Sequence, residues 1–308
     1  MEPNPAAASP ASAIKKSGWQ IHRPGLGASE EGDAEAALLL TEELRRDQWQ
    51  IPPLPAVAHE LIQLANDPES KPAKIVALIE RDVSLATRLL RLASSVAFGA
   101  SRVTDLRRAV VKIGNAGLRT VALASAMSNA FKAGALARLA RAEMEHAYVV
   151  AVGSAWVARK LGLDPAQAFM SGMMHDVGCL ALLSVLANGA HTKGKPITPA
   201  TALPVLANLH ADAGALVAHS WALDENVVAA IRLHHMVAEA TVSRATLAVA
   251  LADAAEEIHH PDAEEHMREL MNHPARIELD LGHADILDLV HAIADARNDG
   301  VASAFGGA

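Results

Sequence analysis

The chain has 308 residues, and 51% of them are hydrophobic, so it is long enough and apolar enough to bury a sizeable core. Only 3% are aromatic, while Ala, Leu and Val predominate, a composition that favours helices over strands and predicts an all-α fold. The formal net charge of −8 argues against non-specific binding to nucleic acid. The single cysteine, Cys179, excludes an internal disulfide and fits a reducing compartment.

The sequence gives no signal for a membrane. No uninterrupted apolar run reaches the roughly 18 residues that a transmembrane helix needs. The first residues lack the basic start and apolar centre of a signal peptide. We therefore expect a cytoplasmic protein that makes no contact with a membrane.

The first half of the chain predicts a tail and then a set of short helices. Residues 1–33 are rich in Ala, Pro, Ser and Gly without periodicity, which predicts a disordered tail. Ser84 is expected to cap a helix that runs to Ser95, and the other helices are expected at 34–46, 56–66, 71–80, 104–114 and 118–131. Gly134 marks a predicted boundary, so residues 34–133 form one helical lobe.

The second half predicts another lobe, at residues 134–297. Asp164 with Pro165, Asp224 and Ser243 are expected to begin three of its helices. The full set is expected at 138–161, 165–176, 203–221, 225–235, 244–260 and 284–297, and residues 180–187 form an apolar stretch followed by a loop. Residues 298–308 are predicted to be a flexible tail.

Charge is distributed unevenly along the chain. Residues 71–120 carry ten Lys and Arg against three acids, a local net charge of +7, whereas residues 261–308 carry three Arg against ten acids, a net −7. Solvated helix faces explain both patterns, and a basic surface for an anionic ligand or an acidic partner is the alternative. The candidate anion-binding residues are Arg102, Arg107, Arg108, Lys112 and Arg119. Their helix–glycine–helix pattern also occurs in any helical bundle, so it does not favour nucleic-acid binding.

Histidines and aspartates at the predicted helices carry the clearest chemical signal. His175 and Asp176 are adjacent where an apolar segment ends at Gly178. The further candidate ligands are His146, His210, His234, His235 and Asp253. Imidazole nitrogens and carboxylate oxygens suit Zn, Fe, Mn or Mg, and a helical bundle can aim such side chains at one interior point. The alternative is a buried polar network in which these groups satisfy one another and fix the packing.

The order of these residues resembles the HDOD family, the HD-related output domains of bacterial signalling proteins. The resemblance runs from about residue 51 to 297. It is strongest in Leu54-Pro55-Ala56, in Leu89 to Ser95, in Ala109 to Leu118, in Gly172 to Gly178, in His210 to Ala215 and in Ile231 to His235. It implies a two-lobe all-α fold, with a family-specific N-terminal lobe and a C-terminal lobe similar to the HD domains of metal-dependent phosphohydrolases.

The resemblance also implies roles for the candidate ligands. His146, His175, Asp176 and Asp253 match the metal ligands of HD-type relatives, and His210, His234 and His235 match the additional histidines of HD-GYP proteins. One or two divalent ions are therefore expected. Asp176 would also be a catalytic proton acceptor if the protein were a hydrolase.

Three departures from the hydrolase pattern weaken a catalytic interpretation. Cys179 stands where a phosphate-holding Lys or Arg often follows the His-Asp pair, and no Gly-Tyr-Pro segment follows His235. The acid that some HD-GYP sites place one helical turn before the first histidine is absent, because that position is Ala142.

Two hypotheses about function follow from the resemblance and its departures. The leading one is a non-catalytic regulatory module of bacterial signalling that acts through a protein partner and retains an HD-type metal site. The alternative is a divalent-metal-dependent phosphohydrolase acting on a nucleotide or cyclic dinucleotide. A nucleotide is in either case a candidate ligand.

Overall fold

A computed structural model describes residues 40–42, 44, 51–131, 133–188, 197–238, 241–256, 258 and 263–299. Within these ranges all regular secondary structure is helical and no strand occurs, which confirms the all-α prediction. The predicted tail 1–33 lies outside the described residues, and so does most of the predicted helix 34–46. Residues 40–42 and 44 of that helix are described and are helical.

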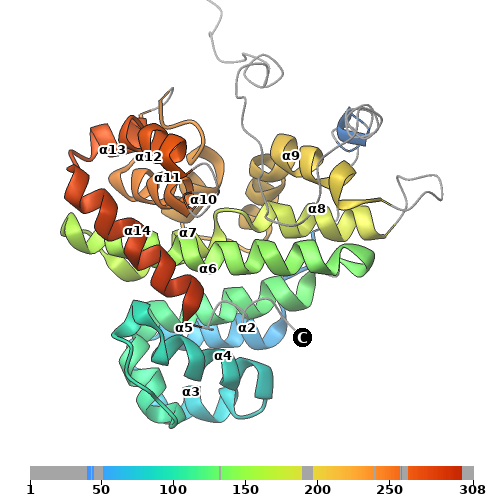
Figure 1. The fold of residues 1–308 in the computed structure, drawn as a ribbon. Helices are drawn as coiled ribbons and strands as arrows, with labels where there is room; N and C mark the ends of the chain where they lie inside the picture. Colours follow the sequence, from blue (N-terminus) through green and yellow to red (C-terminus); the bar gives the residue numbers. More distant parts are fainter. Residues whose placement is uncertain are drawn as a thin grey trace, which may run out of the picture.

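Within residues 51–131, four α-helices form the N-terminal part of the molecule, in the lower half of Figure 1. They are α2 (Ala56–Asn66), α3 (Pro72–Ile79), α4 (Val83–Ser94) and α5 (Leu106–Ala130). The predicted cap at Ser84 is wrong: Asp82 caps α4, and its carboxylate accepts the backbone N–H of Leu85 at 3.0 Å. Asp82 is extended and one residue ahead of the first helical residue, which is the geometry that an N-cap requires.

Helix α5 contains the break predicted near residue 114. Gly114 has φ 64° and ψ −174°, so two helical segments meet there in a kink. Asp105 caps the first segment by accepting the N–H of Arg108 at 2.8 Å. A short 3-10 helix, η2 (Val96–Phe98), precedes α5, and another, η3 (Gly134–Leu136), follows it at the predicted lobe boundary.

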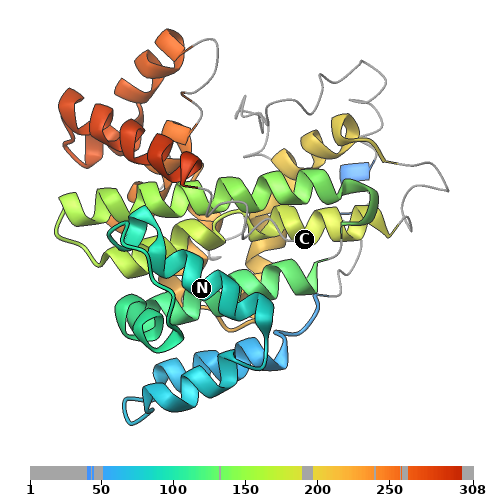
Figure 2. The same ribbon diagram turned by 60° about the horizontal axis from the view of Figure 1, so that its bottom comes forward.

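The rest of the chain is built around α6 (Ala137–Lys160), which crosses the middle of the molecule in Figures 1 and 2. Asp164, Asp224 and Ser243 cap helices as predicted. Helices α12 and α13 were not predicted. The helices that follow α6 are α7 (Pro165–Met174), α8 (Val177–Ala187), α9 (Pro199–Ser220), α10 (Glu225–Leu233), α11 (Arg244–Glu256), α12 (Ala263–Met271), α13 (Pro274–Glu278) and α14 (His283–Asn298).

The main hydrophobic core continues across the predicted boundary at residues 133 and 134. It is one cluster of buried side chains that runs from Ala58 of α2 to Ala296 of α14. Aromatic pairs join the two sides: Phe98 meets Phe169 edge to face at 5.8 Å, and Phe131 stacks on Trp221 at 5.7 Å. The division into two lobes at this residue therefore stays a prediction.

One stretch of the structure, residues 165–187, is long and apolar enough to cross a membrane by length and composition alone. It is not an uninterrupted apolar run in the sequence, because His175 and Asp176 lie within it. Its most apolar window is 89% buried inside the molecule. The apolar side chains of α7 and α8 thus serve as core.

Candidate metal centre

Six helices bring the seven predicted ligands together. His146 lies in the middle of α6, His210 in α9 and Asp253 in α11. The other four stand at helix ends: His175 and Asp176 form the junction between α7 and α8, and His234 and His235 follow α10. The ligand atoms fall into two groups, each with all its atoms within 4.8 Å of one another.

Two glycines allow this convergence because they let helices approach more closely than any side chain would permit. A Cβ atom on Gly178 would lie 1.9 Å from the carbonyl oxygen of His210 and 2.5 Å from the backbone nitrogen of Gly214. A Cβ atom on Gly172 would lie 2.7 Å from Cα of Ala151 in α6. The glycines flanking the His-Asp pair therefore place it against α9 on one side and α6 on the other.

The first ligand group contains His146, His175 and Asp253, with Asp176 beside them. The Nε2 atom of His146 lies 3.2 Å from Nε2 of His175 and 3.2 Å from Oδ1 of Asp253. The Nε2 atom of His175 lies 3.7 Å from the same oxygen of Asp253. The Oδ2 atom of Asp176 lies 3.5 Å from Nε2 of His175 and 3.7 Å from Nε2 of His146.

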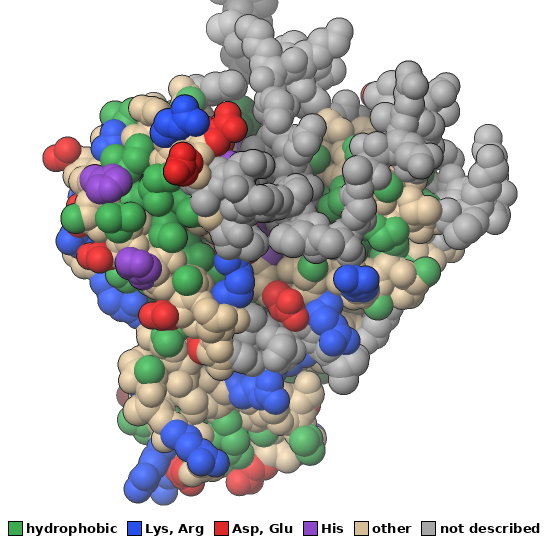
Figure 3. Space-filling view, viewed as in Figure 1, with side chains coloured by type: hydrophobic (Ala, Val, Ile, Leu, Met, Phe, Trp, Pro, Cys, Tyr) green, Lys and Arg blue, Asp and Glu red, His purple; other side chains and the backbone are tan. Residues whose placement is uncertain are grey.

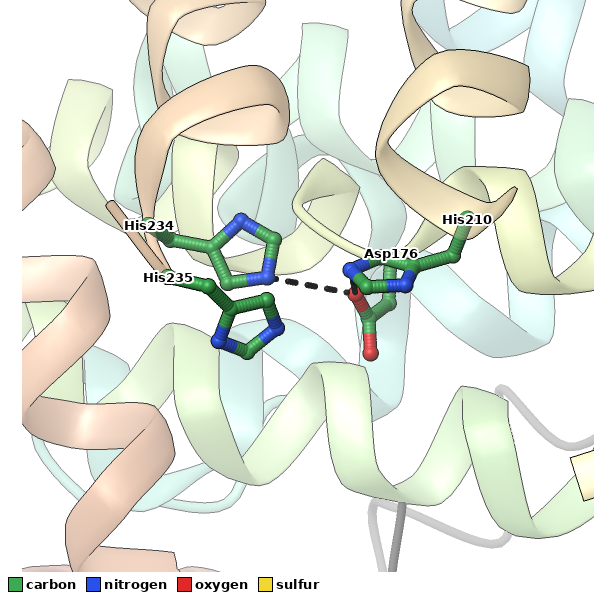
Figure 4. Close-up of side chains that lie close together, drawn as sticks. All are labelled: Asp176, His210, His234 and His235. Atoms are coloured by element: carbon green, nitrogen blue, oxygen red, sulfur yellow. Dashed lines mark ion pairs between the residues drawn. The ribbon is translucent and has the colours of Figure 1, made fainter. Parts of the chain in front are cut away.

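The second ligand group contains Asp176, His210, His234 and His235 (Figure 4). The Oδ1 atom of Asp176 lies 3.5 Å from Nε2 of His234 and 3.7 Å from Nε2 of His210. The two sequential rings of His234 and His235 lie side by side, with their centroids 3.8 Å apart. Asp176 thus turns one oxygen to each group, so its carboxylate bridges the two.

The spacing of these atoms fits divalent ions. Ligand atoms about 2.0–2.3 Å from one ion, at angles of about 90–110°, stand about 2.9–3.7 Å from one another. In the first group, the five distances between ligand atoms of the two histidines, Asp253 and Asp176 lie between 3.2 and 3.7 Å. The donors are imidazole nitrogens and carboxylate oxygens, which suit Zn, Fe or Mn. The residues of the first group therefore fit one ion, and those of the second group offer the same donor types with their ligand atoms within 4.8 Å of one another.

Hydrogen bonds behind the ligands fix which ring nitrogen faces the centre. The Nδ1 atoms of His175, His210 and His234 lie 2.8, 2.9 and 2.9 Å from the backbone oxygens of Gly172, Leu206 and Ala230, respectively. A carbonyl can only accept, so each Nδ1 carries a hydrogen, and in the neutral form of each ring Nε2 has the lone pair. That is the tautomer in which histidine binds a metal through Nε2.

Electrostatics within the centre favour ionised carboxylates. Burial alone would raise the pKa of Asp176, but His175, His210 and His234 hold it well below its usual range. Burial would likewise raise the pKa of Asp253, and hydrogen bonds from the first group's histidines lower it well below that range. Both carboxylates are therefore anionic near neutral pH, as metal ligation requires.

The histidines of the second group differ among themselves. Burial lowers the pKa of His210 and lowers that of His235 well below its usual value. Burial also acts to lower the pKa of His234, but its contact with Asp176 outweighs burial and the pKa is raised. A divalent ion in this group would have to displace the proton that His234 and Asp176 share.

Sequence reasoning missed three residues around the centre. Glu143 and Cys179 are buried beside Asp176, with ligand atoms of all three within 4.8 Å of one another. An acid one turn before His146 is expected at position 142, which is Ala142, but position 143, three residues before the histidine, is also one turn away and holds Glu143. Glu256 lies with Oε2 3.4 Å from Nδ1 of His146, and its place at the end of α11 gave no sequence signal.

The candidate anion-binding residues lie on different elements from the ligands. Arg102, Arg107 and Arg108 are exposed in the N-terminal part, where Figure 3 shows several Lys and Arg side chains with acids beside them. Lys112 donates to the carbonyl of Ala93 at 2.6 Å, and Arg119 donates to Oδ1 of Asn66 at 3.1 Å. None of the five belongs to either ligand group, and anion binding by them stays a prediction.

Comparisons with known proteins agree with this fold. A protein of unknown function from Treponema pallidum (strain Nichols) is 28% identical over 194 residues, which cover 60% of this chain but only 37% of that protein. A solved structure from Shewanella amazonensis SB2B, named a candidate metal-dependent phosphohydrolase, has a TM-score of 0.67 at 17% identity and covers 87% of this chain and 100% of its own. One from Marinobacter aquaeolei VT8, named a candidate signal transduction protein, has a TM-score of 0.53 at 18% identity and covers 91% of this chain and 68% of its own.

The HDOD domain family matches residues 51–237, which include six of the seven candidate ligands; Asp253 lies beyond the match. The agreement of this match with the helical fold confirms the resemblance seen in the sequence. The chain belongs to the HDOD domain family.

Proposed function

We propose that the protein is a cytoplasmic regulatory module of signal transduction that acts through a protein partner and holds one or two divalent ions in a non-catalytic centre. Membership of the HDOD family supports the signalling role, and the name of the Marinobacter structure agrees with it. The two ligand groups support the metal. The single cysteine supports a reducing compartment.

The observation that carries the non-catalytic part is the burial of the ligands. His175 is 0% exposed, and none of the other ligands except His235 is more than 7% exposed. Catalysis at a metal needs an open coordination position that substrate or water can reach. Ligands buried this deeply leave a phosphate ester little access to an ion held between them. Such a centre would stabilise the packing of α6 to α11 and leave the outer helix surfaces for a partner.

Metal content tests the first part of this proposal. Protein purified without chelator is expected to carry one to two equivalents of Fe, Mn or Zn by elemental analysis. Asp176→Asn should lose ions from both groups, because Asp176 faces both, whereas Asp253→Asn should lose chiefly the ion of the first group. Substoichiometric metal, with a melting temperature that does not change on adding Mn²⁺ or Fe²⁺, would count against a metal centre.

A metal-dependent phosphohydrolase is the second candidate, and the bridging carboxylate favours it. Two-metal hydrolases place a pair of ions about 3.5–4 Å apart, a separation that one shared carboxylate can span. His235, whose side chain is 19% exposed, opens the second group to solvent on one side. Bound ions would supply a Lewis acid and a water of lowered pKa. Asp176 and Asp253 would hold those ions, and Asp176 would be the nearest anionic proton acceptor.

Turnover separates the two candidates. The metal-loaded protein is expected not to hydrolyse cyclic dinucleotides or bis(p-nitrophenyl) phosphate above the rate of the His175→Ala variant. Metal-dependent turnover that disappears in His175→Ala would sink the non-catalytic proposal and establish the hydrolase.

A further inference from the structure

The outer nitrogen of His146 faces a different kind of acceptor from those of its neighbours. His175, His210 and His234 each turn Nδ1 to a backbone carbonyl of their own segment. His146 instead turns Nδ1 to the carboxylate of Glu256, with 3.4 Å between Nδ1 and Oε2, while its Nε2 faces the first ligand group. Among these four histidines, only His146 therefore has its outer nitrogen facing a side chain. The position of that side chain depends on its own contacts, whereas the backbone carbonyls are fixed by the helix or turn that carries them.

Glu256 is held in this position from α14. Arg297 reaches the last residue of α11 and donates both to Oε1 of Glu256 and to its backbone oxygen, the latter at 3.1 Å. The grip on two oxygens of one residue fixes the direction of the Glu256 side chain as well as its place. Both side chains are partly shielded, Glu256 at 12% and Arg297 at 30% exposure, so the pair is screened less than a surface ion pair.

Helix α14 itself packs obliquely across α6, as Figure 1 shows. Near its start, Asp285 pairs with Lys160, with 2.6 Å between Oδ1 and Nζ. Just past its end, Asp299 accepts a hydrogen bond from the Tyr148 hydroxyl at 2.7 Å. Its buried face consists of Ile286, Leu289, Ile293 and Ala296. Together, these contacts fix the position of α14 on the molecule and therefore the position of Arg297 beside Glu256.

We propose that Glu256 is the positioning residue for His146, that Arg297 holds Glu256 in place, and that the affinity of the first ligand group for a divalent ion therefore depends on the docking of α14. A carboxylate behind a ligand histidine fixes the ring and makes its inner nitrogen a stronger donor. Glu256 and Arg297 both lie beyond residues 51–237, so this control belongs to the part of the chain outside the family match. The inference rests on the metal binding proposed above.

Calorimetric titration of the metal-free protein with Mn²⁺ or Co²⁺ tests the inference. Glu256→Ala is expected to weaken binding to the first ligand group by about 10- to 100-fold, the usual cost of losing such a partner, and to leave the second group within about twofold. Glu256→Gln should fall between the wild type and Glu256→Ala, because its amide oxygen still presents a partial negative charge toward Nδ1 of His146 but the full charge is lost. Arg297→Ala should weaken the same group, and Arg297→Lys should restore part of the affinity.

The matched control is Asp295→Asn. It removes an exposed carboxylate from α14, two residues before Arg297, and leaves the Arg297–Glu256 pair, the Asp285–Lys160 pair and the buried face of the helix in place, so metal affinity should stay within about twofold of the wild type. The melting temperature of each metal-free variant separates positioning from folding: a variant that weakens both groups equally and also melts lower would show a structural role and overturn the inference.

Two further outcomes distinguish failure of this inference from failure of the proposed metal centre. If the wild type binds ions and Glu256→Ala binds them equally well, only the inference fails. If the wild type binds no divalent ion, the proposed metal centre fails and the inference with it.

Discussion

Asp176 shows, at the scale of one residue, why the geometry of this centre favours a metal site. Without an ion, hydrogen bonds from its neighbours would have to compensate its buried carboxylate for the loss of water. Its carboxylate is 3% exposed, and its two oxygens face histidines at 3.5 to 3.7 Å on both sides. These distances are longer than strong charge-assisted hydrogen bonds, which measure about 2.7–2.9 Å. They match the spacing of ligands around an ion, so a buried polar network alone explains the geometry less well.

His235 predicts how the metal-free protein responds to acid. Burial lowers its pKa well below the usual value, so the folded state disfavours the proton that the unfolded chain takes up near pH 6.5. The stability that neutral His235 contributes is present above that pH and is lost as the pH falls below it. In the presence of chelator, the free energy of unfolding from denaturant titrations should thus drop more steeply between pH 7 and 5 in the wild type than in His235→Gln.

Exposed His219 provides the control for this experiment. His219→Gln should follow the wild-type pH dependence. Parallel curves for the wild type and His235→Gln would contradict the prediction.

At the scale of helices, the junction between α7 and α8 is the element on which the centre depends. The chain bends there at His175 and Asp176, and Gly178 then lets α8 lie against the backbone of α9. The caps at Asp164, Asp224 and Ser243 follow from local chemistry, which is why the sequence predicted them correctly. The contact partner of Gly178 is not local, so no window of sequence could identify it.

Gly178→Ala is expected to destabilise the protein strongly. Its Cβ would lie 1.9 Å from the His210 carbonyl oxygen, so α8 and α9 must separate, at a cost of about 3 kcal/mol or more. Asp176 and His210 would move apart with them, and metal affinity should fall in parallel. Denaturant unfolding and metal titration measure the two effects.

Gly282→Ala is the matched substitution. Its Cβ would meet only Oδ2 of Asp285, at an ordinary 3.5 Å, and its φ is −80°. Its unfolding free energy should stay close to that of the wild type. Similar losses in the two variants would mean that the close approach at Gly178 is not the cause.

At the scale of the whole molecule, the N-terminal helices and the metal-centre helices share one core. The edge-to-face pair of Phe98 and Phe169 and the stack of Phe131 on Trp221 cross the predicted boundary. Trp221 also donates its indole hydrogen to the backbone oxygen of Pro52 at 2.9 Å, and Arg159 donates to the backbone oxygen of Ala97. The two parts therefore bury much of their apolar surface against each other.

This shared core predicts a single cooperative unfolding transition. In scanning calorimetry of the metal-free protein, the calorimetric and van't Hoff enthalpies should agree. Phe131→Ala should lower the one melting temperature, since it removes an aromatic side chain from the junction, and should not split the transition. Two separate transitions in the wild type would show instead that the parts unfold independently.

The sequence by itself determined the helical class, most helix ends and the seven candidate ligands. These follow from composition, from capping residues and from the order of the His and Asp residues along the chain, all of which are local or one-dimensional. The cap at Asp82 and helices α12 and α13 escaped because short helices with competing caps carry weak local signals.

The family resemblance already separated His210, His234 and His235 from the other candidate ligands. Only the tertiary structure decided that Asp176 faces both groups, with one oxygen toward each, and which residues stand behind the ligands. The approach of Glu256 to His146 depends on α14, which begins 137 positions after that histidine in the chain. Contacts between residues so far apart arise from helix packing and close glycine contacts, which no local pattern encodes.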